Sequence, residues 1–266
     1  MKKINFLIIV PTLNSYRLLW RLQKSLEEQS YNNWRVVFVD ANSNKDHVEY
    51  LEKLNKFDRR YSFIKQDKNK YKGIYGAMNQ GLKHAKKGEW ILFWGSDDWA
   101  YNKNVFSKLV KKINQYEELD PYLIIAKARY YDFKKSQMKR KSIFLRKNLN
   151  VINSKTFRKY LFLGCSPPHQ GTIFSPKAVE ISNIYNEKFS IAGDLNYFLK
   201  ISKFKNINIL LFNSNLVIMG LGGYSSFSNW KRIKEVLNIY FKNFKYFVIF
   251  PLLLRYLMRF FSLLEI

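Results

Sequence analysis

The stretch Gly88-Glu-Trp-Ile-Leu-Phe-Trp-Gly-Ser-Asp-Asp-Trp99 decides the fold of this chain. Gly88 is a typical helix stop, and the apolar run from Trp90 to Trp94 has the length and composition of a buried strand. The run leads into two adjacent carboxylates, Asp97 and Asp98. Hard divalent cations that carry substrate phosphates take one or two carboxylates as ligands. The stretch therefore predicts a cation site at the edge of an open sheet, where ligands bind, although a solvated turn also explains the acid pair.

Strands and helices alternate through the N-terminal part of the chain. Apolar runs predict strands at residues 4–10, 34–39, 61–65 and 90–94, and helical spacing predicts helices at residues 18–26, 48–55 and 73–87. Continuous apolar strands are typical of a sheet that is covered on both faces. The fold class is therefore α/β, with a Rossmann-like, mostly parallel sheet flanked by helices.

Length and composition predict one substantial core with an appendage. The chain has 266 residues, of which 47% are hydrophobic and 17% are aromatic. The single Cys165 excludes an internal disulfide framework and a cysteine-rich zinc site, which fits a reducing, cytoplasmic setting. His47, His84 and His169 show no metal-binding spacing. We interpret the apolar N-terminal run as a first strand, because it is short for a signal peptide and lacks a small-residue cleavage site.

The net charge of the chain is strongly positive, with 46 Lys and Arg against 20 Asp and Glu, a balance of +26. Such a field attracts nucleic acid, anionic lipid or phosphorylated small molecules; a lysine-rich bias without a specific partner is the alternative. A nucleic-acid-binding protein would place stacking aromatic side chains within its basic face. Most aromatic residues here lie in strand-like or interface-like runs, so we expect no nucleic-acid partner.

Polar side chains collect where the predicted strands end. They are Thr12 and Asn14 after the first strand, Asp40 and Asn42 after the second, and Asp97 and Asp98 after the fourth. The chain lacks the Gly-x-Gly-x-x-Gly and Gly-x-x-x-x-Gly-Lys-Ser/Thr patterns, which argues against a dinucleotide enzyme and a P-loop NTPase. Asp40 is an acceptor suited to the imide N–H of uracil, and a helix-capping aspartate is the alternative for this residue.

Four segments carry a resemblance: residues 10–14, residues 39–43 with Asp46, residues 73–81 followed by 88–98, and residues 169–170 with 191–194. Taken in this order, they resemble family 2 glycosyltransferases of the GT-A fold, of the bacterial cell-surface polysaccharide type. Val10-Pro-Thr-Leu-Asn14 is similar to the opening strand and turn of that family, and Val39-Asp-Ala-Asn-Ser43 with Asp46 is similar to its Asp-x-x-Ser-x-Asp loop. The segment from Gly73 to Gly81, followed by Gly88 to Asp98, resembles the part that closes on its metal-binding acids. His169-Gln170 with Ile191-Ala-Gly-Asp194 resembles the acceptor-side half.

The resemblance implies a donor site for a nucleotide-sugar, with UDP-sugar as the expected donor. Asp40 would bind the uracil, and Thr12 would lie beside the base or the ribose. Asn14 and Asn42 belong to the same two nucleotide-binding loops.

The resemblance also implies a metal site and a catalytic base. Asp98 would bind Mn²⁺ or Mg²⁺, which bridges the diphosphate, and Asp97 would share this metal site and face the ribose and the sugar. Lys72 stands where the family has a basic residue near the phosphates, and His169 would line the donor diphosphate or the acceptor pocket. Asp194 would be the catalytic base.

The chain departs from the family pattern on the sugar side of the site. Gly76 and Tyr71 stand where the family often has aspartates, and Lys68–Lys70 resembles a local insertion that displaces Asp67. These departures concern the sugar contacts and leave the metal and base positions intact.

The chemistry supports the same roles. A nucleoside diphosphate leaves easily when a divalent cation neutralises its growing charge, and a carboxylate within reach takes the proton of the attacking hydroxyl. One base opposite the leaving group implies in-line displacement with inversion. Asp194 follows Gly193 at a predicted helix start, which also suits an ordinary N-cap, and the Pro167-Pro168-His169 turn also suits a structural role. Glu187 is the next acid to consider.

The C-terminal segment differs in composition from the rest of the chain. We divide the chain into a glycosyltransferase domain at residues 1–225 and an amphipathic, basic and aromatic helical tail at residues 226–266. The uncharged run Tyr246–Leu254 is interrupted by Pro251 and is too short to span a bilayer. Such composition suits helices in a membrane interface with anionic lipid, and packing on the catalytic domain or in a homo-oligomer is the alternative.

The sequence thus favours an inverting, metal-dependent glycosyltransferase that works peripherally at the inner face of the cell membrane. Its acceptor would be a hydroxyl of a glycan or a lipid-linked glycan in surface polysaccharide or glycolipid synthesis. A nucleic-acid-binding protein and a sugar nucleotidyltransferase are the alternatives. The latter needs a glycine-rich, basic loop after the first strand, which residues 11–16 do not provide.

Overall fold

A computed structural model describes residues 2–142, 144, 149–181, 185–221 and 229–264. The strands are β1 (Asn5–Thr12), β2 (Trp34–Asp40), β3 (Tyr61–Lys65), β4 (Glu89–Phe93), β5 (Trp99–Ala100), β6 (Leu123–Asp132), β7 (Gln137–Lys141), β8 (Val151–Asn153), β9 (Thr172–Phe174) and β10 (Asn208–Leu221). The α-helices are α1 (Tyr16–Glu27), α2 (Lys45–Phe57), α3 (Gly73–Leu82), α4 (Val105–Gln115), α5 (Ser154–Phe162), α6 (Pro176–Ile181), α7 (Gly193–Ile201), α8 (Asn229–Phe244) and α9 (Ile249–Leu264). Short 3-10 turns include η2 (His169–Gly171) and η4 (Lys245–Phe247).

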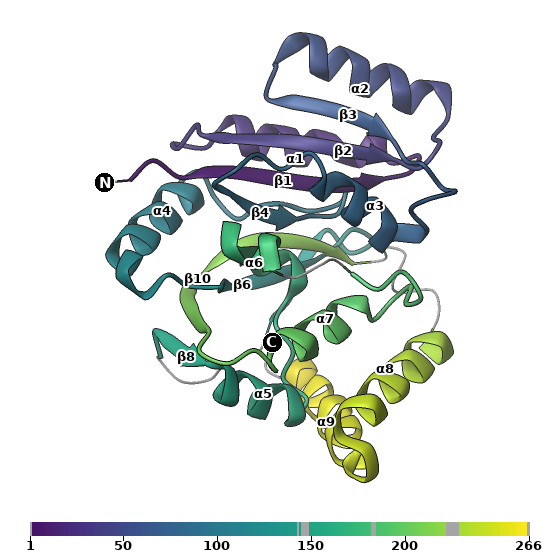
Figure 1. Ribbon diagram of the computed structural model, residues 1–266. Helices are drawn as coiled ribbons and strands as arrows, with labels where there is room; N and C mark the ends of the chain where they lie inside the picture. Colours follow the sequence, from purple (N-terminus) through teal and green to yellow (C-terminus); the bar gives the residue numbers. More distant parts are fainter. Residues whose placement is uncertain (1, 143, 145–148, 182–184, 222–228, 265–266) are drawn as a thin grey trace.

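One mixed sheet runs through the molecule in the order β3-β2-β1-β4-β9-β6-β10-β5 (Figure 1). Strands β3, β2, β1 and β4 are parallel to one another, and β6 is parallel to β10. Strand β9 is antiparallel to both β4 and β6, so β6 runs in the direction of β4. The predicted α/β class with a mostly parallel sheet is confirmed. The antiparallel pairings of β5, β8 and β9 were not predicted, because they join segments far apart in the chain, and the local hairpin of β6 and β7 was not predicted either.

The sheet separates two hydrophobic clusters, which explains the continuous apolar strands. In β1, Phe6, Ile8 and Val10 belong to one cluster, whereas Leu7 and Ile9 belong to the other. Helices α1, α2 and α4 cover the first face, and α3, α5, α6, α7 and α8 cover the second. A strand between two covered faces buries side chains on both of its sides, and β1 is buried and apolar from Phe6 to Val10 for that reason.

The polypeptide between α3 and β4 is the main local departure from the sequence-based element bounds. Helix α3 ends at Leu82 rather than near residue 87, and a turn leads to Gly88, whose φ of 84° lies in the left-handed region. Gly88 therefore serves the entry into β4 rather than the end of the helix. At the start of α1 the N-cap residue is Ser15, and Asn14 precedes it with a φ of 50°.

The C-terminal helices lie at the opposite end of the molecule from α2 and β3 (Figure 1). Helix α8 buries Val236, Ile239 and Tyr240 in the second cluster, so it is an integral part of the core. The predicted boundary after residue 225, with the turn at residues 222–226, lies outside the described residues, and the division into two domains stays a prediction. None of the helices described here is both long and apolar enough to cross a membrane.

Candidate active site

The loops after β1 and β2 are joined at the carboxyl edge of the sheet. Thr12 and Asp40 are register partners at the ends of these strands. The Asn14 backbone N–H donates to Oγ of Ser43 at 2.8 Å, and the Asn44 backbone N–H donates to Oδ1 of Asn14 at 2.8 Å. These hydrogen bonds hold the two loops side by side, as expected for two loops that share one ligand. Asn42 is exposed in the same loop, with a φ of 69°.

Asp40 is buried at the end of β2, with only 4% of its surface exposed. Its Oδ2 accepts the backbone N–H of Ser43 at 3.1 Å, whereas its Oδ1 has no hydrogen-bond partner among the described residues. A buried carboxylate oxygen without a donor carries a large desolvation cost. A ligand N–H would remove that cost, so Asp40 has the properties of a binding residue rather than of a helix cap.

His47 lies behind Asp40 and was not recognised as a site residue from the sequence. Its Nε2 lies 2.9 Å from Oγ1 of Thr12 and 3.7 Å from Oδ1 of Asp40. Burial lowers the pKa of His47, against the opposing charge of Asp40, so the neutral imidazole is favoured. The available signal was its helical spacing from Leu51 and Leu54, the buried residues of α2, which places His47 on the inner face of that helix.

The paired acids after β4 occupy a turn between β4 and β5. Oδ2 of Asp98 accepts the backbone N–H of Gly95, and Asp98 is 2% exposed. Burial, followed by the repulsion of Asp97, raises the pKa of Asp98 well above its ordinary value. Burial also raises the pKa of Asp97. Two adjacent buried carboxylates disfavour their joint ionisation, and a bound cation reverses that effect.

Two glycines open space beside Asp97. A Cβ atom at Gly95 would stand 2.7 Å from Oδ1 of Asp97, and a Cβ atom at Gly220 would stand 2.6 Å from Oδ2. Asp98 accepts a hydrogen bond from the backbone of its own turn, so we consider Asp97 the more available of the two carboxylates for a ligand. Among the residues described, His, Cys, Asp and Glu form no group of three or more suited to a metal. A pair of carboxylates fits Mg²⁺ or a similar hard cation, which completes its shell with phosphate and water oxygens.

Asp194 is the second residue of α7, and the N-cap position of that helix belongs to Ala192. The Asp194 backbone N–H donates to the hydroxyl of Tyr75 at 3.2 Å, and Oδ1 of Asp194 accepts the N–H of Leu195 at 2.7 Å. Gly193 lets this helix start approach α3 closely, because a Cβ atom there would stand 2.7 Å from the Tyr75 ring. Asp194 is partly exposed, and it follows the N-cap position of α7 rather than occupying it.

His169 lies in η2 and is 8% exposed. Its Nε2 is 2.6 Å from the hydroxyl of Tyr185, and its ring stacks on Phe93 with centroids 5.5 Å apart. Burial lowers the pKa of His169 to about 4, although the charge of Asp194 opposes that shift. The imidazole is therefore neutral near pH 7. Its role at the diphosphate or the acceptor stays a prediction, and it would act there without a positive charge.

Lys72 is the exposed N-cap residue of α3, and its backbone N–H donates to Glu187 at 2.7 Å. The other carboxylate oxygen of Glu187 accepts from the side chain of Asn79 at 2.9 Å. Glu187 thus connects the loop before α7 to α3. The glycine at position 76 also has a packing cause, because a Cβ atom there would stand 2.5 Å from the Tyr71 backbone. An aspartate side chain has no room there.

Glu235 of α8 organises the approach to α7 and was not identified from the sequence. Its carboxylate accepts the backbone N–H groups of Ser190, Ile191 and Ala192 and the hydroxyl of Ser190, at 2.8–2.9 Å. Burial raises the pKa of Glu235, but these hydrogen bonds outweigh it and leave the pKa below its ordinary value. The C-terminal segment therefore contributes a structural contact two residues before Asp194.

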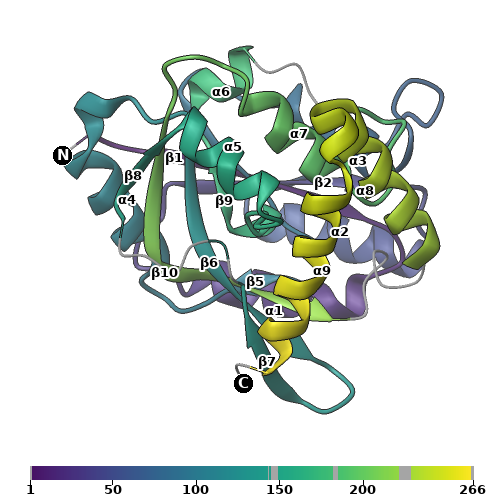
Figure 2. The same ribbon diagram turned by 90° about the horizontal axis from the view of Figure 1, so that it is seen from below.

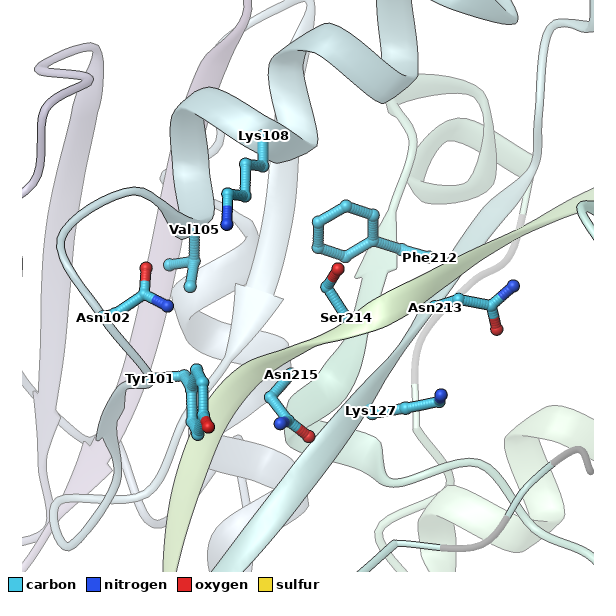
Figure 3. A pocket seen from close by; sticks show the side chains of 9 residues that line it. All are labelled: Tyr101, Asn102, Val105, Lys108, Lys127, Phe212, Asn213, Ser214 and Asn215. Atoms are coloured by element: carbon cyan, nitrogen blue, oxygen red, sulfur yellow. The ribbon is translucent and has the colours of Figure 1, made fainter. Parts of the chain in front are cut away.

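A separate pocket of about 280 Å³ lies where β10 is irregular (Figure 3). Lys108 of α4 and Lys127 of β6 line it with Tyr101, and the remaining lining is rich in amide side chains. None of the carboxylates described above lies in its wall. We therefore do not assign the reaction to this pocket.

The family model described as "Glycosyl transferase family 2" matches residues 7–179 of this chain. The chain therefore belongs to glycosyl transferase family 2. The matched range includes the loops after β1 and β2 and the paired acids, and it ends before Asp194.

Curated relatives carry glycosyltransferase names. The chain is 30% identical over 130 residues to the glycosyltransferase GlyA of Streptococcus pneumoniae, covering 49% of this chain and 17% of the relative. It is 26% identical over 155 residues to the cholesterol galactosyltransferase of Borreliella burgdorferi, covering 58% and 41%. It is 32% identical over 108 residues to the GalNAc(5)-diNAcBac-PP-undecaprenol beta-1,3-glucosyltransferase of Campylobacter jejuni, covering 41% and 34%. The chain thus spans less than half the length of each of these relatives.

Solved structures share the fold over most of this chain. The crystal structure of S. aureus TarS 1-349 in complex with UDP-GlcNAc matches with a TM-score of 0.66 at 20% identity, covering 89% of this chain and 66% of that one. The mannosyltransferase PcManGT from Pyrobaculum calidifontis, in complex with GDP-Man and Mn²⁺, matches with a TM-score of 0.63 at 15% identity, covering 98% and 72%. These matches confirm the GT-A-type fold.

Proposed function

We propose that this protein transfers a sugar from a nucleotide-sugar, with UDP-sugar as the donor, to a hydroxyl of a glycan or lipid-linked acceptor, with inversion at the anomeric carbon. The observation that carries the proposal is the buried Oδ1 of Asp40, which has no hydrogen-bond partner among the described residues. Asp40 ends β2, and the paired acids follow β4; only β1 separates these two strands in the sheet. The UDP-GlcNAc complex of TarS supports UDP as the nucleotide. The names of the Campylobacter and Borreliella relatives support a lipid-linked or lipid acceptor.

The donor would lie along the carboxyl edge of the sheet. Uracil presents an imide N–H that matches Oδ1 of Asp40, and Thr12 lies beside that position in the register of β1 and β2. Asp97 and Asp98 follow β4, the other neighbour of β1. The diphosphate would therefore extend from the end of β1 toward the end of β4, with Lys72 contributing positive charge. No glycine-rich, basic loop follows β1, which argues against a nucleotidyltransferase.

Asp97 and Asp98 would hold Mn²⁺ or Mg²⁺ at the diphosphate. When bound, such an ion supplies Lewis-acid neutralisation of the charge that develops on the departing nucleotide. Asp194 would accept the proton of the acceptor hydroxyl, since it is partly exposed and does not occupy the N-cap position of α7. The Mn²⁺ in the PcManGT complex supports a metal in this fold.

Replacing Asp40 by Ala is expected to weaken UDP binding by about ten- to a hundred-fold, because a hydrogen bond to a charged group contributes roughly 1.5–3 kcal/mol. The measurement is calorimetric titration of UDP into the full chain. Glu52→Ala is the control, since Glu52 is an exposed acid of α2, the helix that follows the same loop. Equal UDP affinity in Asp40→Ala and the unaltered protein would refute the donor assignment.

An exposed apolar surface at the C-terminal end suits the interface of an anionic membrane. We define the tail surface by Tyr246, Phe247, Ile249, Phe250, Leu253 and Leu257, which are 91, 62, 61, 59, 57 and 50% exposed, respectively. The exposed side chains of Lys242 and Lys245 border it. Contiguous apolar exposure marks an interaction site, and basic borders favour anionic lipid. We place the enzyme peripherally at the inner, cytoplasmic face of the membrane.

The double substitution Phe247→Ser and Phe250→Ser is expected to abolish co-sedimentation with phosphatidylglycerol vesicles at moderate salt, since burial of apolar side chains drives interfacial binding. Phe57→Ser is the control, because Phe57 is a 78% exposed phenylalanine on α2. Point variants are preferred to a truncation of the C-terminal segment, because a truncation would also remove the buried side chains of α8. Unchanged sedimentation of the double variant would contradict the membrane assignment. A concentration-dependent dimer of the unaltered protein that dissociates in the double variant would also contradict it and would favour a homo-oligomer.

A further inference from the structure

Aromatic side chains from three segments meet beside the paired acids. Trp99 of β5, Tyr131 of β6 and Phe133, in the turn after β6, have ring centroids 5.3–6.1 Å apart. We call this group the aromatic shelf. All three residues are partly exposed, and neither hydrophobic cluster contains them. The shelf therefore faces solvent, unlike the aromatic residues of the core.

Arg21 of α1 lies against this shelf. Its guanidinium carbon is 5.1 Å from the centroid of Phe133 and 5.8 Å from that of Trp99. Among the described residues, Arg21 forms no ion pair with a carboxylate. A guanidinium can stack on aromatic faces while its N–H groups stay free to bind a carboxylate or a phosphate in a bidentate manner.

The shelf adjoins the acids directly. A Cβ atom at Gly220 would stand 2.6 Å from Oδ2 of Asp97 and 2.6 Å from Cε2 of Phe133, so these two side chains flank one glycine. Trp99 follows Asp98 in the chain. No larger residue fits at position 220 without separating the shelf from the acids.

The position of the shelf along the sheet points to the acceptor rather than the nucleotide. Asp40 stands at the end of β2, the acids follow β4, and the shelf belongs to the β6-β10-β5 part of the sheet. The shelf thus lies beyond the acids as seen from Asp40. Strand β7 pairs with the end of β6, and Figure 2 shows the end of α9 at β7, which it contacts.

We propose that the aromatic shelf and Arg21 form an acceptor subsite for a sugar ring that bears an anionic group, a carboxylate or a phosphate. The inference rests on the proposed glycosyltransferase function. The aromatic faces would pack against the apolar face of the sugar ring, and the N–H groups of Arg21 would bind its anionic substituent. Binding there places the acceptor beside Asp97, where the transferred sugar is expected.

The test is a titration of three small probes into the full chain saturated with UDP, with binding detected by ligand-observed NMR. The probes are methyl glucuronide, glucose 6-phosphate and the neutral methyl glucoside, so that carboxylate, phosphate and uncharged sugars are compared. We expect the unaltered protein to prefer at least one anionic probe. Arg21→Gln should weaken the affinity for that anionic probe by about ten-fold or more, as expected for loss of a charge-assisted hydrogen bond. The affinity for methyl glucoside should change little. Trp99→Ala should weaken all three probes.

Arg17→Gln is the matched control, because Arg17 is an exposed arginine one turn earlier on α1 that interacts with the ring and the hydroxyl of Tyr16. It should bind every probe as the unaltered protein does. Arg21→Lys keeps the charge without the planar fork and should show an intermediate loss, which separates recognition from folding. Equal binding of anionic and neutral probes, or equal losses in Arg17→Gln and Arg21→Gln, would overturn the subsite. UDP affinity reports separately on the proposed function, which fails if the unaltered protein does not bind UDP.

Discussion

Asp97→Asn is expected to lower sugar transfer by about two to four orders of magnitude and to remove its stimulation by Mn²⁺. The reason is the loss of one carboxylate from a pair that would hold the cation, and cation neutralisation of a leaving group contributes several kcal/mol. Asp97 is preferred to Asp98 for this test, because Asp98 also accepts the N–H of Gly95 and its replacement would disturb the turn. Transfer is measured by release of UDP from a panel of UDP-sugars.

Thermal unfolding without metal separates this effect from misfolding. Burial raises the pKa of Asp97 in the folded protein. A carboxyl group whose pKa is raised by folding opposes folding at pH values above its unfolded pKa, where the unfolded chain is ionised, and this cost is absent at lower pH. Removing that charge should therefore not lower the melting temperature at pH 7. Normal transfer with Mn²⁺ stimulation in Asp97→Asn would refute the metal assignment.

The sequence predicted features that depend on neighbouring residues. The apolar run before Asp97 and Asp98 forms β4, and Thr12 and Asp40 end adjacent parallel strands. In both cases a continuous apolar strand ends at a polar residue, so local pattern is enough to locate the edge of the sheet. The roles of these residues stay predictions.

Features that depend on contacts between distant segments were not predicted. Glu235 binds the backbone before Asp194 from a helix more than forty residues further along the chain. Gly220 lies between the side chains of Asp97 and Phe133, but the sequence around it is only that of a strand and does not indicate this contact. The amphipathic pattern of α8 likewise fits both a membrane surface and a buried core face, and only its packing shows that Val236 and Tyr240 are buried. Sequence periodicity identifies an apolar face but not what covers it.

Glu235 also changes how the C-terminal segment relates to the reaction. The tail surface lies on α9 and on the turn before it, while α8 holds the loop that precedes Asp194. A helix that contributes both to the core and to the neighbourhood of Asp194, the proposed base, is not a detachable anchor. Membrane contact and the position of the base would then depend on the same helical pair, which favours acceptors presented at the membrane surface.

Asp194→Asn is expected to lower transfer by about two to four orders of magnitude, the usual contribution of a positioned general base, with UDP affinity nearly unchanged. The substitution keeps the shape of the side chain, and its amide oxygen can still accept the N–H of Leu195. The N-cap of α7 is Ala192, so the variant removes no cap and the helix should persist. Transfer rate and UDP affinity are measured on the same folded sample.

Glu187→Gln is the comparison that gives the result its meaning. Glu187 is the next acid in this region, and its two oxygens already accept from the Lys72 backbone and the Asn79 side chain. A glutamine there keeps one acceptor, so we expect a modest loss of stability and transfer within about ten-fold of the unaltered protein. If Glu187→Gln loses transfer by orders of magnitude while Asp194→Asn retains it, the base is Glu187 and the helix start at Asp194 is structural. Loss of transfer in Asp194→Asn with retention in Glu187→Gln would identify Asp194 as the group that takes the acceptor proton. The reason is that Asp194→Asn removes the basicity of the side chain and no group that binds the nucleotide.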